Sequence, residues 1–116
     1  MTERRKRGLY GEMAAARYLR DEGYEILAAN YRVRAGEIDL VAGDGAFVCF
    51  VEVKTRDPDA FFDPAEAVDA GKAERVRAAA AAFLAATGLA LPARYDIMEV
   101  TASPDGYACK YIKNAF

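Results

Sequence analysis

The chain has 116 residues, of which 53% are hydrophobic and 29% charged, and it contains no histidine. This length and composition are those of one folded domain with one core. Without histidine there is no Ser-His-Asp or Cys-His nucleophile system, no histidine general base and no His-ligated zinc site. The predicted chemistry therefore depends on carboxylates, lysine, tyrosine or metal-bound water.

The net charge of −2 is distributed unevenly along the chain. Residues 1–34 carry 8 basic and 5 acidic groups, residues 35–71 carry 2 and 9, and residues 72–116 carry 6 and 4. A protein that coats phosphates by charge alone is usually basic throughout. The pattern instead predicts basic flanks around an acidic centre that a bound cation would neutralise.

Neither a secretory signal nor a membrane span is expected. The basic N-terminal residues are followed by no apolar stretch, and the alanine-rich run at 78–86 is too short to cross a bilayer. We therefore expect a cytoplasmic protein. Cys49 and Cys109 match no metal-ligand spacing, and a reducing cytosol favours free thiols over a disulfide.

Helical periodicity predicts a first helix over 9–22 that ends before Gly23. The residues that recur at helical spacing are Leu9, Met13, Ala16 and either Leu19 or Arg20. Residues 1–7 are expected to form a flexible basic tail of the single domain, 1–116. Residues 24–34 are predicted to form a strand that bends near Ala28 and Asn30, followed by strands over 37–42 and 46–55 joined through Gly43, Asp44 and Gly45.

The residues Asp63-Pro64-Ala65-Glu66 combine a helix N-cap, a first-turn proline and a capping-box glutamate. The helix that they start is expected to reach Thr87 and end at Gly88, and Gly71 offers a break near its start. Its packing face is predicted to consist of Val76, Ala80, Phe83 and Thr87. Strands over 93–100 and from 109 onward complete the order α-β-β-β-α-β-β. The predicted fold class is α/β, with a mixed five-stranded sheet flanked by helices.

Charged side chains interrupt the apolar pattern of the second and third strands. Alternation places Glu37 and Asp39 on one face of 37–42 and Ile38 and Leu40 on the other. On 46–55, Glu52 and Lys54 share a face.

The simplest hairpin register places Asp39 opposite Phe50 or Glu52. Two carboxylates on neighbouring positions of paired strands repel one another unless a cation or a proton lies between them. One interpretation is that these are exposed halves of amphipathic strands, with Lys54 neutralising Glu52. The other is a buried cluster with a chemical role, since helices would cover both faces of strands this apolar and an unpaired buried carboxylate costs several kcal/mol.

Metal-assisted phosphodiester hydrolysis is the chemistry that suits two acids and a lysine. Asp39 and Glu52 offer the hard oxygen ligands that Mg²⁺ or Mn²⁺ prefers, and the Val53 carbonyl is a further candidate. Lys54 would orient the attacking water or stabilise the transition state. Glu12 is a third candidate acid, although a carboxylate in the first turns of a helix also has the helix dipole as an explanation. Glu37 shares the face of Asp39, and its two alternatives are a helper ligand and only a charge at the rim of the sheet.

The chain resembles the YraN family of small bacterial proteins, whose fold is similar to that of Holliday junction resolvases in the PD-(D/E)xK, restriction endonuclease-like superfamily. The matching blocks are GLYGEMAAARYL (8–19), NYR (30–32), GEIDLVA (36–42), FVEVKTR (50–56), Ala67-Val68 with Lys72, and the terminal NAF. The resemblance assigns Asp39 to the superfamily's aspartate, Glu52 and Lys54 to its E-x-K, and Glu12 to the first-helix glutamate of resolvases. Ile38 stands where the superfamily has proline.

The resemblance implies a Mg²⁺- or Mn²⁺-dependent nuclease that cleaves DNA, at branches or ends, and works as a homodimer as resolvases do. No membrane and no small-molecule cofactor are expected. Candidate phosphate contacts are Arg17, Arg56 and Lys72. Two alternatives are an accessory module that binds DNA or RNA on the same fold without cleaving it, and a purely structural cluster of ion pairs.

Overall fold

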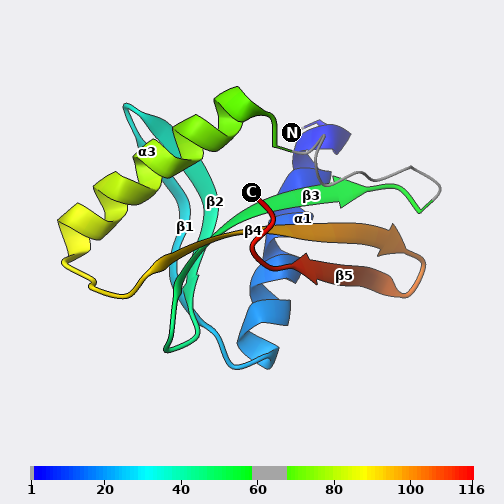
Figure 1. Ribbon diagram of the computed structural model, residues 1–116. Coiled ribbons are helices and arrows are strands. Elements are labelled where there is room, and N and C mark those ends of the chain that lie inside the picture. Colours follow the sequence, from blue (N-terminus) through cyan, green and yellow to red (C-terminus); the bar gives the residue numbers. More distant parts are fainter. Residues whose placement is uncertain (1, 59–67) are drawn as a thin grey trace.

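The computed structural model describes residues 2–58 and 68–116, except for the side chain of Arg4. Its helices and strands follow in the predicted order (Figure 1). They are α1 (Glu3–Asp21), β1 (Glu25–Val33), β2 (Gly36–Gly43), β3 (Val48–Arg56), α3 (Ala70–Thr87), β4 (Ala93–Ser103) and β5 (Gly106–Ile112). The α/β class is confirmed. The predicted helix start at Asp63 to Glu66 lies outside the described residues.

All five strands form one mixed sheet in the order β1-β2-β3-β4-β5. β3 and β4 are parallel, and every other neighbouring pair is antiparallel. One core cluster packs α1 against β2, β3 and β4, and a second packs α3 against the opposite face of β2 and β3. The middle strands are therefore covered on both faces, as their apolar sequences require.

α1 begins at Glu3, six residues before its predicted start, because the side chain of Thr2 accepts a hydrogen bond from the Arg5 N–H at 3.2 Å. The residues expected to form a flexible tail therefore make the opening turns of the helix. At the other end Gly23 has φ 89°, and the Tyr24 N–H donates to the Leu19 carbonyl. This left-handed glycine ends the helix as predicted.

The buried stripe of α1 differs from the prediction. Ala15, Ala16 and Leu19 are buried, but Leu9 and Met13 are 44% and 59% exposed. Periodicity correctly predicted a helix in this part of the chain but misplaced part of its buried face. The reason is that mainly small residues, rather than Leu9 and Met13, contact the sheet.

Asp69 caps the start of α3, since its carboxylate accepts a hydrogen bond from the Lys72 N–H at 2.8 Å. Gly88, with φ 71°, caps its end. Val76, Ala80 and Phe83 are buried as predicted. Thr87 is instead exposed. Among the described residues, no helix is both long and apolar enough to cross a membrane.

Asp96 is a fully buried carboxylate that ties the C-terminus to β4. It accepts hydrogen bonds from Arg94 Nε at 3.0 Å, from the Asn114 N–H at 2.8 Å and from the Tyr111 hydroxyl. Burial and the neighbouring Asp96 charge raise the pKa of Tyr111, so its proton stays in this bond. Because the carboxylate is fully paired, we interpret this cluster as structural.

Two glycines allow the helices to approach the sheet closely. A Cβ atom at Gly11 of α1 would lie 1.8 Å from Thr55 Oγ1 of β3. A Cβ atom at Gly36 of β2 would lie 2.4 Å from the Arg75 carbonyl oxygen of α3. Both distances are far below van der Waals contact, so larger residues would push the helices outward.

Replacement of Gly36 by alanine should therefore destabilise the protein. The added methyl group meets the backbone of α3 rather than a flexible side chain, so Gly36→Ala is expected to lower the free energy of unfolding by about 1–3 kcal/mol. Gly8→Ala is the matched control, since nothing lies within 4 Å of its Cβ position and alanine favours the helix. Urea denaturation measures both, and equal stabilities of the two variants would contradict the close packing.

Candidate active site

The sheet divides between β2 and β3. These strands pair from Gly43 and Val48 only as far as Leu40 and Val51, whereas β3 pairs with β4 over all nine of its residues. Figure 1 shows β1 and β2 turning away from β3. The next residue pair, Asp39 and Glu52, therefore lies at the point where the two strands separate.

The separation changes the face that the start of β2 presents. Alternation predicted Ile38 and Leu40 on one face, opposite Val41. Leu40 does pack beneath α1, but Ile38 packs together with Val41 beneath α3. The prediction was wrong for Ile38 because strict alternation holds only along a regular strand, and β2 loses its β3 partner at Asp39.

Asp39 connects the two separating strands through its side chain. Its Oδ2 accepts a hydrogen bond from the Val53 backbone N–H at 2.8 Å, beyond the last backbone pair of β2 and β3. Burial raises the pKa of Asp39, and the Val53 hydrogen bond opposes that rise. The carboxylate thus satisfies a backbone donor that the divided sheet leaves unpaired.

Glu52 is only 3% exposed and forms a hydrogen bond with the carboxyl group of Asp39. Burial, followed by the charge of Asp39, raises the pKa of Glu52 to about 7. Near neutral pH, without a metal ion, a proton can therefore bridge the two acids. Carboxylates on opposite faces of the sheet could not have made this contact.

The ion-pair partner of Glu52 is Lys72, whose Nζ lies 2.8 Å from Glu52 Oε2. The interpretation as exposed amphipathic strands paired Glu52 with Lys54, whereas the residue at ion-pair distance is Lys72. Burial alone would lower the pKa of Lys72, but its hydrogen bond with Glu52 raises it. Lys54 is half-buried beside them, and burial, then the charge of Lys72, lowers the pKa of Lys54. The site thus holds two ammonium groups with opposite pKa shifts.

Glu12 approaches the cluster from α1. Burial and the charge of Asp39 raise the pKa of Glu12, whereas a side-chain hydrogen bond with Asn30 and the charge of Arg32 lower it. Asn30 has φ 51°, at the bend predicted for β1. The sequence predicted the bend near Asn30 but not the contact between Asn30 and Glu12. The NYR block at 30–32 is the one sequence feature that could have pointed to this contact.

Glu37 belongs to the rim of the site. Its Oε2 lies 3.2 Å from Arg32 Nε, and both side chains are well exposed. Exposed pairs of this kind contribute little to stability. Of the two alternatives for Glu37, the charge at the rim of the sheet fits this exposed pair.

Two grooves flank the acidic residues and share Arg32. One, of about 560 Å³, contains Arg5, Glu12 and Asn30, and the other, of about 390 Å³, contains Lys72 and Arg75. Basic side chains therefore line both sides of the acidic cluster. Arg32 was absent from the predicted phosphate contacts.

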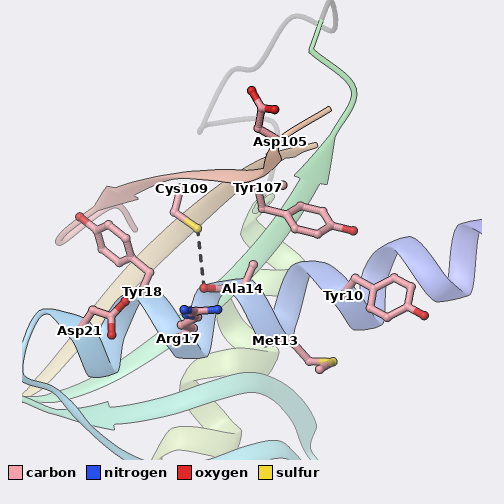
Figure 2. Close-up of a pocket in the computed structure, with 10 residues that line it drawn as sticks. Tyr10, Met13, Ala14, Arg17, Tyr18, Asp21, Asp105, Tyr107 and Cys109 are labelled. Carbon is pink, nitrogen blue, oxygen red and sulfur yellow. Dashed lines mark hydrogen bonds between the residues drawn. The ribbon is translucent and has the colours of Figure 1, made fainter. Parts of the chain in front are cut away.

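The three predicted phosphate contacts do not lie together. Lys72 is in the cluster, and Arg56 is near enough for its charge to lower the pKa of Lys54. Arg17 lies on the outer side of α1, in a third groove with Tyr10 and Asp105 (Figure 2). Arg17 is therefore separated from the acidic residues by the helix that carries it.

Within residues 2–58 and 68–116, no three Cys, Asp or Glu side chains are grouped so that they could hold a metal ion together. The predicted ligands amount to the Asp39 and Glu52 pair. Mg²⁺ is commonly held by one or two carboxylates, with water and substrate phosphates completing its shell. The ammonium group of Lys72 against Glu52 also shows that the pair accepts a cation. The donor set fits Mg²⁺ or Mn²⁺.

Residues 11–100 match the family model described as uncharacterised protein family UPF0102. The chain belongs to this family. It is the YraN family that the sequence motifs resemble. The UPF0102 protein of Symbiobacterium thermophilum is 47% identical over 114 residues, which cover 97% of each chain. That of Moorella thermoacetica is 48% identical over 98 residues, covering 84% of this chain and 82% of the relative. That of Syntrophus aciditrophicus is 41% identical over 117 residues, covering 100% and 92%.

Removal of one charge from the acidic pair should stabilise the metal-free protein. A raised Glu52 pKa means that the folded state loses stability as pH rises from about 4.5 to about 7. Asp39→Asn keeps an oxygen for the Val53 N–H and removes the repulsion. In EDTA at about pH 8, its free energy of unfolding should exceed that of the wild type by about 1–2 kcal/mol.

The difference should shrink at about pH 5, where Glu52 is protonated in both proteins. Chemical denaturation at both pH values measures it. A variant less stable than the wild type at about pH 8 would show that the acids do not repel one another.

Proposed function

We propose that the protein is a metal-dependent nuclease with a restriction endonuclease-like, resolvase-like fold, which cleaves phosphodiester bonds of DNA. The observation that carries the proposal is the contact between Asp39 and Glu52 where β2 and β3 separate, with Lys54 two residues beyond Glu52. This arrangement fits the D…E-x-K motif that the sequence resembles. The order of helices and strands is also the one expected for that fold.

Asp39 and Glu52 would hold Mg²⁺ or Mn²⁺, with the Val53 carbonyl as a further candidate ligand. The bound cation would polarise the scissile phosphate and lower the pKa of an attacking water. The hydrogen bond from the Val53 N–H to Asp39 restricts the rotation of that carboxylate before any ligand arrives. A ligand that is already oriented loses less conformational freedom on binding.

Lys54 is the residue proposed to act on the reacting groups. Burial, followed by the charge of Lys72, lowers the pKa of Lys54, so its ammonium group gives up a proton more readily than a surface lysine. In its charged form it would stabilise the negative charge that develops on the phosphate. Glu12, oriented by Asn30, would accept a hydrogen bond from water on the α1 side of the cluster.

The flanking grooves supply candidate contacts to the nucleic-acid backbone. Arg5 and Arg32 line one groove, and Lys72 and Arg75 line the other, so phosphates on either side of the scissile bond would meet positive charge. The two grooves share Arg32, so a substrate that enters both would be bent or branched there. DNA branches and ends are therefore included in the test.

The activity test uses fluorescent single-stranded, duplex, flap and four-way-junction DNA, together with RNA, each with Mg²⁺, Mn²⁺ or EDTA. We expect metal-dependent cleavage of at least one DNA substrate. Asp39→Asn and Lys54→Met should each lower its rate by about 100-fold or more. Glu25→Gln should retain it, since Glu25 lies on β1 opposite Gly43, at the far end of β2 from Asp39.

Binding without cleavage across the panel would favour the accessory module over the nuclease. Equal loss of rate in Glu25→Gln and Asp39→Asn would indicate a general effect on folding, which thermal melting of each variant checks. Cleavage that persists in EDTA would contradict the metal-dependent mechanism.

Lys72 competes with a metal ion for Glu52, because its Nζ already lies 2.8 Å from the carboxylate. Lys72→Met keeps an apolar stem and removes the charge, so the apparent Kd for Mn²⁺ should fall by about tenfold. Titration calorimetry measures it without turnover. Lys113→Met, an exposed lysine beyond β5, serves as the control.

An unchanged or higher Kd in Lys72→Met would place the metal away from Glu52. In Ca²⁺, the same variant should bind DNA more weakly than Lys113→Met does, because a groove then lacks one of its positive charges.

A further inference from the structure

The outer side of α1 and the start of β5 expose apolar side chains around a groove of about 560 Å³. Tyr10, Met13 and Tyr107 are 49%, 59% and 42% exposed, which makes them half of the six large exposed hydrophobic residues of the described chain. Figure 2 shows Tyr10 and Met13 on α1 and Tyr107 on β5, and all three line this groove. Aromatic residues and methionine are enriched in protein interfaces. We call this area the α1–β5 surface.

Charges of both signs surround the α1–β5 surface. Arg17 and Asp21 come from α1, and Asp105 comes from the turn before β5. Two carboxylates beside one guanidinium would repel a nucleic-acid backbone. A second copy of the chain presents the same set and, across a two-fold axis, can place its carboxylates against Arg17. The charges therefore favour a copy of this chain over a nucleic acid as the occupant.

β5 also forms an open edge of the sheet. It pairs with β4 in an uninterrupted register from Gly106 to Ile112 and has no strand on its other side within residues 2–58 and 68–116. Lys110 is its only charged residue, and it contains no proline. The opposite edge, β1, has a bulge and the left-handed Asn30, which disfavour further pairing. Apart from Lys110, β5 thus carries none of these features that block pairing with another strand.

We propose that two copies of the chain form a dimer through antiparallel pairing of their β5 strands, with the outer side of α1 packed against its counterpart. A two-fold axis perpendicular to the sheet reverses strand direction and keeps each α1 on the same face, so both contacts form together. Tyr10, Met13 and Tyr107 would bury roughly 300 Å² of side-chain surface per copy. The paired β5 edges and charged rim add to this area, toward the ~800 Å² per partner of stable interfaces.

The dimer leaves the acidic cluster accessible. Glu12 lines a groove on one side of α1, while Tyr10 and Met13 line the α1–β5 surface on the other. The proposal therefore stands whether or not the protein cleaves DNA.

Light scattering after size-exclusion chromatography and sedimentation velocity, over about 5–200 µM of the full chain, test the dimer. The wild type is expected at the mass of two chains. Met13→Glu introduces a charge at a position that is already exposed, so the fold should persist while the dissociation constant rises at least about tenfold. Leu91→Glu is the matched control, since Leu91 is 39% exposed on the connection before β4, and it should remain dimeric.

Hydrogen exchange gives a second readout. Amides in residues 106–112 should become more protected as wild-type concentration rises, and this change should be absent in Met13→Glu. A wild type that stays at the mass of one chain, or a Met13→Glu variant that remains dimeric, overturns the proposal. The proposal is also overturned if the wild type is a monomer that binds labelled single-stranded DNA and Met13→Glu abolishes this binding. The α1–β5 surface would then bind nucleic acid.

Discussion

The hydrogen bond from the Val53 N–H to Asp39 is the interaction on which the candidate site depends. β3 needs a partner on its β2 side beyond Val51, and β2 has already turned away with β1. A side-chain oxygen from Asp39 takes the place of the missing backbone acceptor. The same carboxylate is thereby held against Glu52. The separation of β2 from β3 and the contact between Asp39 and Glu52 therefore have the same structural cause.

The charges at this point are only partly balanced. Lys72 pairs with Glu52, yet the pKa values of Asp39, Glu52 and Glu12 all remain raised, with burial as the largest cause. Burial without full compensation opposes folding, so an apolar cluster of similar size would be expected to stabilise the protein more. Three such acids beside two lysines form an arrangement that is more typical of functional sites than of clusters that stabilise a fold.

The sequence predicted what depends on near neighbours in the chain. Alternation along β3 placed Glu52 with Lys54, and the left-handed glycines marked the ends of both helices. Contacts that depend on how a helix docks could not be read in this way. Lys72 of α3 reaches Glu52 of β3 across 20 positions of the chain, and the close approach of α3 to β2 at Gly36 is part of that docking. Ile38 was misplaced because the loss of a strand partner breaks a local pattern.

α1 illustrates why periodicity alone misjudged one face of a helix. Gly11, Ala15 and Leu19 face the sheet, and the absence of a side chain at Gly11 brings the helix so close to Thr55 that neighbouring larger residues cannot turn inward. Met13 is left outside, and Glu12 is carried to the acidic residues instead. A single close approach therefore sets both sides of the helix: it directs a carboxylate toward the cluster and leaves Met13 on the exposed apolar surface proposed as the dimer contact.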